Sequence, residues 1–203
     1  MAKQETETND GQRKGWTRSS MKVVVLREAG YDEAMLGLSL SYLQPVKNMH
    51  KVALKLIPKG EPHCKFLRQV HVWVKITGPW KWWKHLQTYN VGVDWPDFQS
   101  SSTMHKLLSR PLTQENFEDE IHYQVLNVVN SFIHFGNLEK ATDHLPGAFL
   151  YTRVLCFNYS ALRNIVKQRK NHKLQAWQDF IDQLVPQLEH PEWVTKETSS
   201  LSE

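Results

Sequence analysis

The residues best suited to chemistry lie at positions 158–177, in the segment NYSALRNIVKQRKNHKLQAW. A helix that begins near Tyr159 would carry an apolar stripe of Leu162, Ile165 and Val166. The other positions of this segment gather basic groups: Arg163, Lys167, Arg169, Lys170, His172 and Lys173. Because a guanidinium group presents a planar fork to phosphate oxygens, this cluster fits a phosphate pocket. A solvated basic helix face would give the same pattern, so both interpretations stay open.

Metal and nucleophile chemistry have weaker signals. The sequence has ten histidines but neither HExxH nor CxxC, and His63, His71 and His85 fall on elements of different type. We therefore predict no metal site. Cys156 lies in the apolar run VLCF, which would raise the pKa of its thiol, whereas Cys64 lies in a polar turn beside His63. The GxSxG, P-loop and GxGxxG patterns are all absent.

Length and composition place these residues in one large globular domain. The chain has 203 residues, 40% of them hydrophobic, and eight tryptophans supply apolar area for a core. No apolar run is long enough for a membrane helix, and the polar N-terminus lacks the apolar stretch of a signal peptide. Two cysteines fit a reducing compartment, so we expect a cytoplasmic protein. The net charge of +4 suits a phosphorylated substrate and permits nucleic acid without requiring it.

The first half of the domain must position these groups with two strands and two helices. The run MKVVVL at 21–26 predicts a buried strand, and 70–76 (VHVWVKI) alternates as a strand with one buried side. Residues 31–43 predict a helix that ends before Pro45, and a second helix starts at Pro79. The first helix is expected to bury one face: Met35, Leu36, Leu40 and Leu43. Residues 90–102 read as a loop.

The second half is predicted to be mostly helical. A helix is expected at 115–135, with Phe117, Ile121, Val125, Val128 and Phe132 on its apolar face. Residues 154–157 are a short strand candidate, and 159–169 and 174–185 predict two further helices. The result is an α+β domain at 21–190, preceded by a disordered leader at 1–20 and followed by a polar tail at 191–203.

The C-terminal segment resembles a motif of the flavin-dependent thymidylate synthases. In that family an Asn opens a helix, a second Asn follows, and then come an Arg, a His and a Gln. The matching residues here are Asn158, Asn164, Arg169, His172 and Gln175, with the His one position early. The resemblance implies that Asn158, Asn164 and His172 contact flavin and that Arg169 holds the nucleotide as the catalytic residue.

A second stretch resembles the same family. The order of a His, a Phe-containing turn, an alternating strand, a Pro and a helix is matched by His63, Phe66, residues 70–76 and Pro79. The family's Arg-His-Arg signature is replaced here by Thr88-Tyr89-Asn90, and His85 falls on a Gln that contacts nucleotide. Ser100, Ser101 and Ser102 match the serine-rich segment that follows. The similarity covers residues 21–190 and marks a divergent relative.

The resemblance implies a helix-rich fold with a small, mostly antiparallel sheet, in a homotetramer that binds FAD between subunits. His63 would join the flavin contacts, and the substrate contacts would come from His85, Gln175, Arg169 and the three serines. The implied reaction methylates C5 of deoxyuridylate with methylenetetrahydrofolate, reduced flavin supplying the hydride and NADPH reducing the flavin. The lost arginines leave two alternatives: a nucleotide-binding relative without turnover, and a flavoenzyme that modifies another pyrimidine, such as a base in nucleic acid.

Overall fold

The computed structural model describes residues 20–94, 99–101 and 103–197, and its centre is an antiparallel sheet. The strands β1 (Lys22–Ala29), β2 (His71–Pro79), β3 (Gln99–Ser100) and β4 (Leu150–Asn158) lie in the order β1-β2-β4-β3. This confirms the α+β class and the antiparallel sheet. The strand β4 is longer than the predicted 154–157 because residues 150–153 continue the pairing with β2, from Pro79↔Leu150 to Ile76↔Arg153. Ser102 and most of the expected leader lie outside the described residues.

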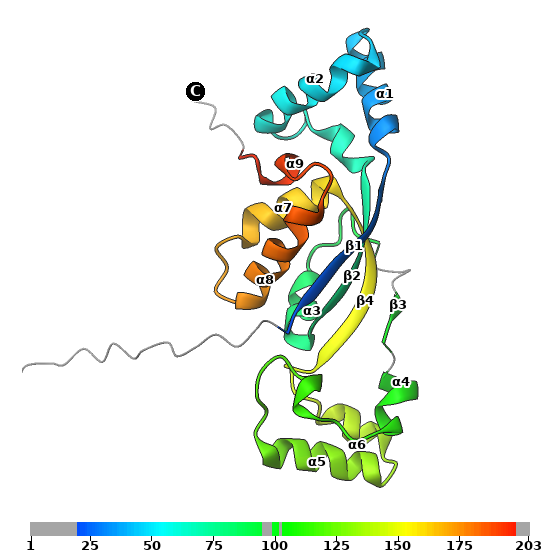
Figure 1. Cartoon of the computed structure of the whole chain (residues 1–203), viewed down its shortest axis with the longest axis vertical. Helices are drawn as coiled ribbons and strands as arrows, with labels where there is room; N and C mark the ends of the chain where they lie inside the picture. The colour runs from blue at the N-terminus through cyan, green and yellow to red at the C-terminus, as the bar shows by residue number, and fades with distance from the viewer. Residues whose placement is uncertain (1–19, 95–98, 102, 198–203) are drawn as a thin grey trace, which may run out of the picture.

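One face of the sheet carries the main hydrophobic core. Val72, Val74 and Ile76 of β2 are fully buried, as the alternation predicted. The helices α3 (Trp80–Leu86), α7 (Tyr159–Arg169) and α8 (Gln175–Leu184) pack into the same core, with α7 and α8 on one side of the sheet (Figure 1). The indoles of Trp82 and Trp83 meet edge to face with ring centroids 5.0 Å apart. These tryptophans are therefore core residues, as expected.

The helices α1 (Tyr31–Tyr42) and α2 (Met49–Leu56) form a pair at the end of the sheet to which β1 leads (Figure 1). The predicted apolar face of α1 is wrong at three of its four positions. The helix buries Ala34, Met35 and Leu38, while the other predicted leucines face solvent: Leu36, Leu40 and Leu43. The sequence of α1 is apolar on several sides, so spacing alone could not select the buried side. The helix α2 was not predicted.

A smaller unit with its own hydrophobic cluster lies at the opposite end of the sheet (Figure 1). It contains α4 (Thr103–Lys106), α5 (Tyr123–His134) and α6 (Leu138–Asp143). The predicted helix 115–135 starts eight residues later than expected, because Thr113 caps a 3-10 turn at Gln114–Asn116 and Phe117 extends to pair with Phe149. Val125 and Val128 are exposed rather than buried. A Lys81–Glu118 ion pair links this unit to α3.

The C-terminal residues correct another prediction. The expected polar tail includes a further packed helix, α9 (Glu192–Thr195), in which Trp193 and Val194 are buried. A helix of one turn is too short to show a periodicity in the sequence. This one has two apolar residues, and its neighbours in the chain are mostly polar. The remaining short elements are 3-10 turns at Val46–Asn48, Ile57–Lys59, Lys65–Arg68, Leu107–Ser109 and Val185–Gln187.

The outer edge of β1 is covered by glutamine side chains from the C-terminal end of α8 and the turn after it. The backbone N–H of Val23 donates to Gln183 Oε1 at 3.1 Å, and Gln183 Nε2 donates to the carbonyl of Met21 at 3.0 Å. Gln187 does the same one step along the strand, accepting from Val25 N–H at 3.1 Å and donating to the carbonyl of Val23 at 2.9 Å. Among the described helices, none is both long and apolar enough to span a bilayer.

Candidate functional site

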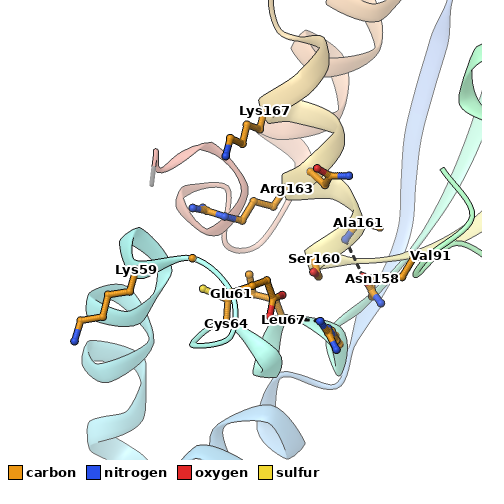
Figure 2. A pocket seen from close by; sticks show the side chains of 13 residues that line it. Lys59, Glu61, Cys64, Leu67, Val91, Asn158, Ser160, Ala161, Arg163 and Lys167 are labelled. Atoms are coloured by element: carbon orange, nitrogen blue, oxygen red, sulfur yellow. Dashed lines mark hydrogen bonds and ion pairs between the residues drawn. The ribbon is translucent and has the colours of Figure 1, made fainter. Parts of the chain in front are cut away.

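A pocket of about 500 Å³ lies between the turn region 59–68 and the first half of α7 (Figure 2). Its wall carries four basic side chains, Lys59, Arg68, Arg163 and Lys167, against one carboxylate, Glu61. Glu61 faces Arg68 at 3.4 Å, so it offsets one of the four charges. The local charge therefore favours an anionic ligand.

Asn158 sits at the pocket wall because it begins α7. Its side-chain Oδ1 accepts a hydrogen bond from the N–H of Ala161 at 2.8 Å, which is the usual N-cap contact (Figure 2). Gly92 lies against the side-chain amide of Asn158. The carbonyl of Gly92 also accepts a hydrogen bond from the backbone N–H of Asn158 at 2.8 Å. Gly92 has φ +75°, and a Cβ there would meet the Asn158 amide at 2.5 Å. Only glycine fits this approach.

The next turns of α7 supply the polar groups that face the pocket. Asn164 is exposed, and its Oδ1 accepts a hydrogen bond from Gln168 Nε2 at 3.0 Å. This contact leaves the Asn164 amide N–H₂ available as a donor toward the pocket. Lys167 lies one turn further along, exposed on the same side of the helix (Figure 2).

Arg163 joins three segments at the back of the pocket. Its guanidinium donates to the carbonyls of Ile57 at 3.1 Å, Trp193 at 3.3 Å and Lys196 at 2.6 Å. Burial lowers its pKa from the ordinary value, and the nearby Cys64 opposes that shift. Arg163 therefore places positive charge at the pocket while it ties α9 to α7.

Neither cysteine is an activated nucleophile. Cys64 is buried rather than exposed in a polar turn, and burial is the main cause that raises the pKa of its thiol. Cys156 lies 3.8 Å from His71 Nδ1, yet burial, followed by the charge of Asp94, raises its pKa to about 11. Both thiols stay protonated near neutral pH. For Cys156 this is the expected setting.

A second group of predicted residues lies at the far end of α7. Arg169 Nε donates to the hydroxyl of Tyr89 at 2.7 Å, and its guanidinium lies 5.1 Å from the ring centroid of Trp177. His172 and His85 have ring centroids 5.9 Å apart, and burial is the main cause that lowers the pKa of His172. The structure thus brings Arg169, His172 and His85 together, but outside the pocket of Asn158 and Asn164.

The remaining predicted residues lie elsewhere in the chain. His63 lines a separate cavity of about 300 Å³ beside α1. Ser100 ends β3, and Ser101 Oγ accepts from Thr152 N–H at 3.2 Å on the neighbouring strand. Gln175 is exposed and bonds Asp179 at 3.0 Å. Three residues of the site were not predicted from the sequence: Gly92, Lys59 and Arg68. They reach the site only in the folded chain, and the glycine in the predicted loop was the one signal in the sequence that could have indicated any of them.

Comparison with known proteins identifies the fold. No protein-family model and no curated protein sequence matches this chain. A structure of the flavin-dependent thymidylate synthase ThyX from Helicobacter pylori, complexed with FAD and dUMP, matches 87% of this chain and 99% of its own, with a TM-score of 0.71 and 13% identity. A second structure of that enzyme with FAD and dUMP gives a TM-score of 0.66 over 85% of this chain and 95% of its own, at 14% identity.

A third structural match comes from a related activity. The UMP/dUMP methylase PolB from Streptomyces cacaoi, bound with 5-Br dUMP, matches 75% of this chain and 79% of its own, with a TM-score of 0.56 and 12% identity. At such low identity a structural match establishes the fold alone. The chain therefore has the fold of the flavin-dependent thymidylate synthases.

Proposed function

We propose that this protein binds FAD and a deoxyuridine nucleotide and acts as a flavin-dependent thymidylate synthase-like enzyme of the cytoplasm. One observation carries the proposal: Asn158 and Asn164, matched by sequence to flavin contacts, line one cationic pocket of a chain with this fold. The similar structures hold FAD and dUMP, or a brominated dUMP, as their bound molecules.

The donor set of the pocket fits a flavin dinucleotide. Lys167 and Arg163 would face its pyrophosphate, and the Asn164 amide would hydrogen-bond a polar edge of the cofactor. Asn158 would keep the start of α7 in place, since its Oδ1 is already used by the helix. When bound, the flavin supplies the hydride that completes methylation at C5, with methylenetetrahydrofolate as carbon donor and NADPH as reductant.

The separation of the predicted residues supports a site built from several copies. His63 lines a cavity beside α1, and Arg169 with His172 and His85 occupies the far end of α7. In a homotetramer with sites between subunits, one copy would offer Asn158 and Asn164 while other copies offer Arg169, His172 or the serines. Arg169 would then hold the nucleotide phosphate, with Ser100, Ser101 and Gln175 as further donors.

A second candidate is a nucleotide-binding relative without turnover. Tyr89, in the middle of the replaced signature, is buried, donates to Gln168 Oε1 at 2.9 Å and accepts from Arg169. Thr88 bonds the carbonyl of His85 at 2.8 Å. These positions serve folding in this chain, which favours a protein that binds nucleotide but lacks the family's full charge set.

The visible absorption spectrum of the protein purified with FAD tests the proposal. We expect a retained oxidised-flavin band, and about a tenfold or greater loss of FAD affinity in Lys167→Ala, since a charge-assisted hydrogen bond contributes about 1.5–3 kcal/mol. Asn164→Ala should also weaken binding. Lys51→Ala, an exposed lysine of α2, is the matched control and should bind FAD as the native chain does.

Three outcomes separate the candidates. Flavin binding with methylation of deoxyuridylate supports the enzyme, and flavin binding with turnover only on another pyrimidine redirects the substrate. Deoxyuridylate binding in calorimetry without flavin supports the second candidate. A chain that binds neither molecule contradicts both.

A further inference from the structure

A chain of four polar side chains leads along α7 from its C-terminal end to the pocket. The Nε–H group of Arg169 donates to the Tyr89 hydroxyl at 2.7 Å, and this hydroxyl donates to Gln168 Oε1 at 2.9 Å. Gln168 Nε2 then donates to Asn164 Oδ1 at 3.0 Å. We call these four residues the amide relay. It connects two separate groups of side chains, because Asn164 lines the pocket and Arg169 does not.

The guanidinium group sets the direction of every hydrogen bond in the amide relay. Arg169 can only donate, so the Tyr89 oxygen accepts from it and the Tyr89 O–H donates onward. A reversed Gln168 amide would place a second N–H donor on the same phenol oxygen, next to a cationic one. Gln168 therefore turns its carbonyl toward Tyr89 and its N–H₂ group toward Asn164, one helical turn away.

The relay is held in place where it starts, at Tyr89 and Arg169. Tyr89 is 8% exposed, and its ring packs edge to face against the indole of Trp177 with centroids 5.9 Å apart. The Arg169 guanidinium lies over both rings, 5.4 Å and 5.1 Å from their centroids. Gln168 and Asn164 are exposed, so the buried hydroxyl of Tyr89 is what gives their amides one orientation.

We propose that Tyr89 and Gln168 are positioning residues, which fix Asn164 so that it offers an N–H₂ donor to the pocket. Neither of the two lines the pocket itself. Lys167 follows Asn164 on the same wall and can also only donate, so this wall is a row of donors. The proposal rests on the proposed function and names the group recognised there: a carbonyl or phosphate oxygen of the cofactor. A ligand edge with N–H groups is disfavoured at this wall.

A relay that served only the stability of the fold would behave differently. Removing the Gln168 amide would then change FAD affinity, if at all, whether or not Asn164 is present. A positioning Gln168 acts through the Asn164 amide, so its removal has no effect once that amide is gone. A double-mutant cycle on FAD affinity separates these two roles.

Calorimetric titration of FAD into the full chain measures this cycle. We expect Gln168→Met to weaken FAD binding about threefold to tenfold, the effect of one neutral hydrogen bond, and Tyr89→Phe to do the same. In the Asn164→Ala background, Gln168→Met should cause no further loss. In the Lys167→Ala background it should cause its full loss, because Lys167 takes no part in the amide relay. Gln124→Met, at an exposed glutamine of α5, is the matched control and should bind FAD as the native chain does.

The results distinguish a failure of the relay from a failure of the proposed function. Losses of Gln168→Met that disappear only in the Asn164→Ala background support the positioning role. FAD binding with fully additive losses overturns that role and leaves the proposed function intact. Native affinity in both Gln168→Met and Tyr89→Phe overturns it as well. A native chain without affinity for FAD overturns the proposed function, and the positioning role with it.

Discussion

The contact between Gly92 and Asn158 shows how one residue can fix a site. Asn158 starts α7 and lines the pocket, and its amide is accommodated because residue 92 has no side chain. Gly92 also adopts φ +75°, where a Cβ is disfavoured. Two separate physical requirements therefore select glycine in a loop that the sequence marked only as irregular.

Gly92→Ala should unfold more easily than a matched control. We expect a loss of about 2–4 kcal/mol, combining left-handed strain with displacement of the Asn158 amide. Gly136→Ala has a similar φ of +67° and no atom within 4 Å of the added methyl, so it should lose about 1 kcal/mol from strain alone. Urea unfolding of both variants measures the difference, and equal losses would contradict the role of the Asn158 contact.

At the residue scale, sequence and structure agree where the signal is local. The position of Asn158 at the start of α7 could be predicted, because an N-cap residue and a family motif coincide there. Arg169 was matched to nucleotide by spacing, yet its guanidinium lies against Tyr89 and Trp177, which are 80 and 8 residues away. Contacts of that kind depend on how helices and loops close on one another, which one sequence does not specify.

At the element scale, α9 is held by an aromatic stack that contains a titratable ring. The His190 ring stacks on the rings of Tyr31 and Trp193, with centroids 4.6 Å from each, and those two rings also contact each other at 5.6 Å. His50, Glu189 and Glu192 face the same imidazole. Burial is the main cause that lowers the pKa of His190, and Glu192 opposes it.

The stability of the protein should therefore fall as the pH drops below about 6.5, the ordinary pKa of histidine. In that window the unfolded chain takes up the His190 proton before the folded chain does, so unfolding is favoured. His172, whose pKa is also lowered, contributes in the same direction. Glu28, with a raised pKa, opposes the loss as the pH approaches 4.5.

His190→Gln should flatten this decline, as measured by urea unfolding at pH 7.5 and pH 5.5. The variant lacks the proton uptake at this position, so its free energy of unfolding should change less between the two conditions. His134→Gln, an exposed histidine of α5, is the control and should keep the native slope. The same slope in His190→Gln and in the native chain would contradict the assignment.

The elements that sequence could predict are those with one clear periodicity. The strand β2 alternates cleanly, and α7 and α8 each carry one apolar stripe, so their bounds agree closely with the prediction. The helix α1 is apolar on more than one side. The helix α5 follows a segment whose apolar residues lie in extended backbone instead of a helix, and α9 is one turn long. In these three cases tertiary packing decided between local alternatives.

At the scale of the whole molecule, charge is divided between the two ends of the sheet. Residues 103–149 contain three lysines and arginines against six carboxylates, in a chain whose net charge is +4. The remaining residues are therefore strongly basic, and the pocket of Asn158 and Asn164 lies among them. An anionic ligand would be drawn to that end of the molecule rather than to the α5–α6 unit.

The glutamines on the edge of β1 should matter most for the behaviour of many molecules together. Replacing Gln183 and Gln187 by alanine removes two donor and two acceptor contacts to the strand, at a cost of about 1 kcal/mol for each residue. We expect faster aggregation on mild heating, measured by light scattering. Gln87→Ala, at the exposed glutamine that directly follows α3, is the control, and aggregation of both variants at the native rate would contradict this role.

The side-chain amides of Gln183 and Gln187 thus make the hydrogen bonds to β1 that a further strand would make. They imitate the peptide groups of a fifth strand without offering a further strand to which another chain could add. At the opposite edge, β3 is two residues long and gives little template for growth. Strand addition between copies is therefore disfavoured at the covered part of β1 and at β3, and with it the route to open-ended fibres.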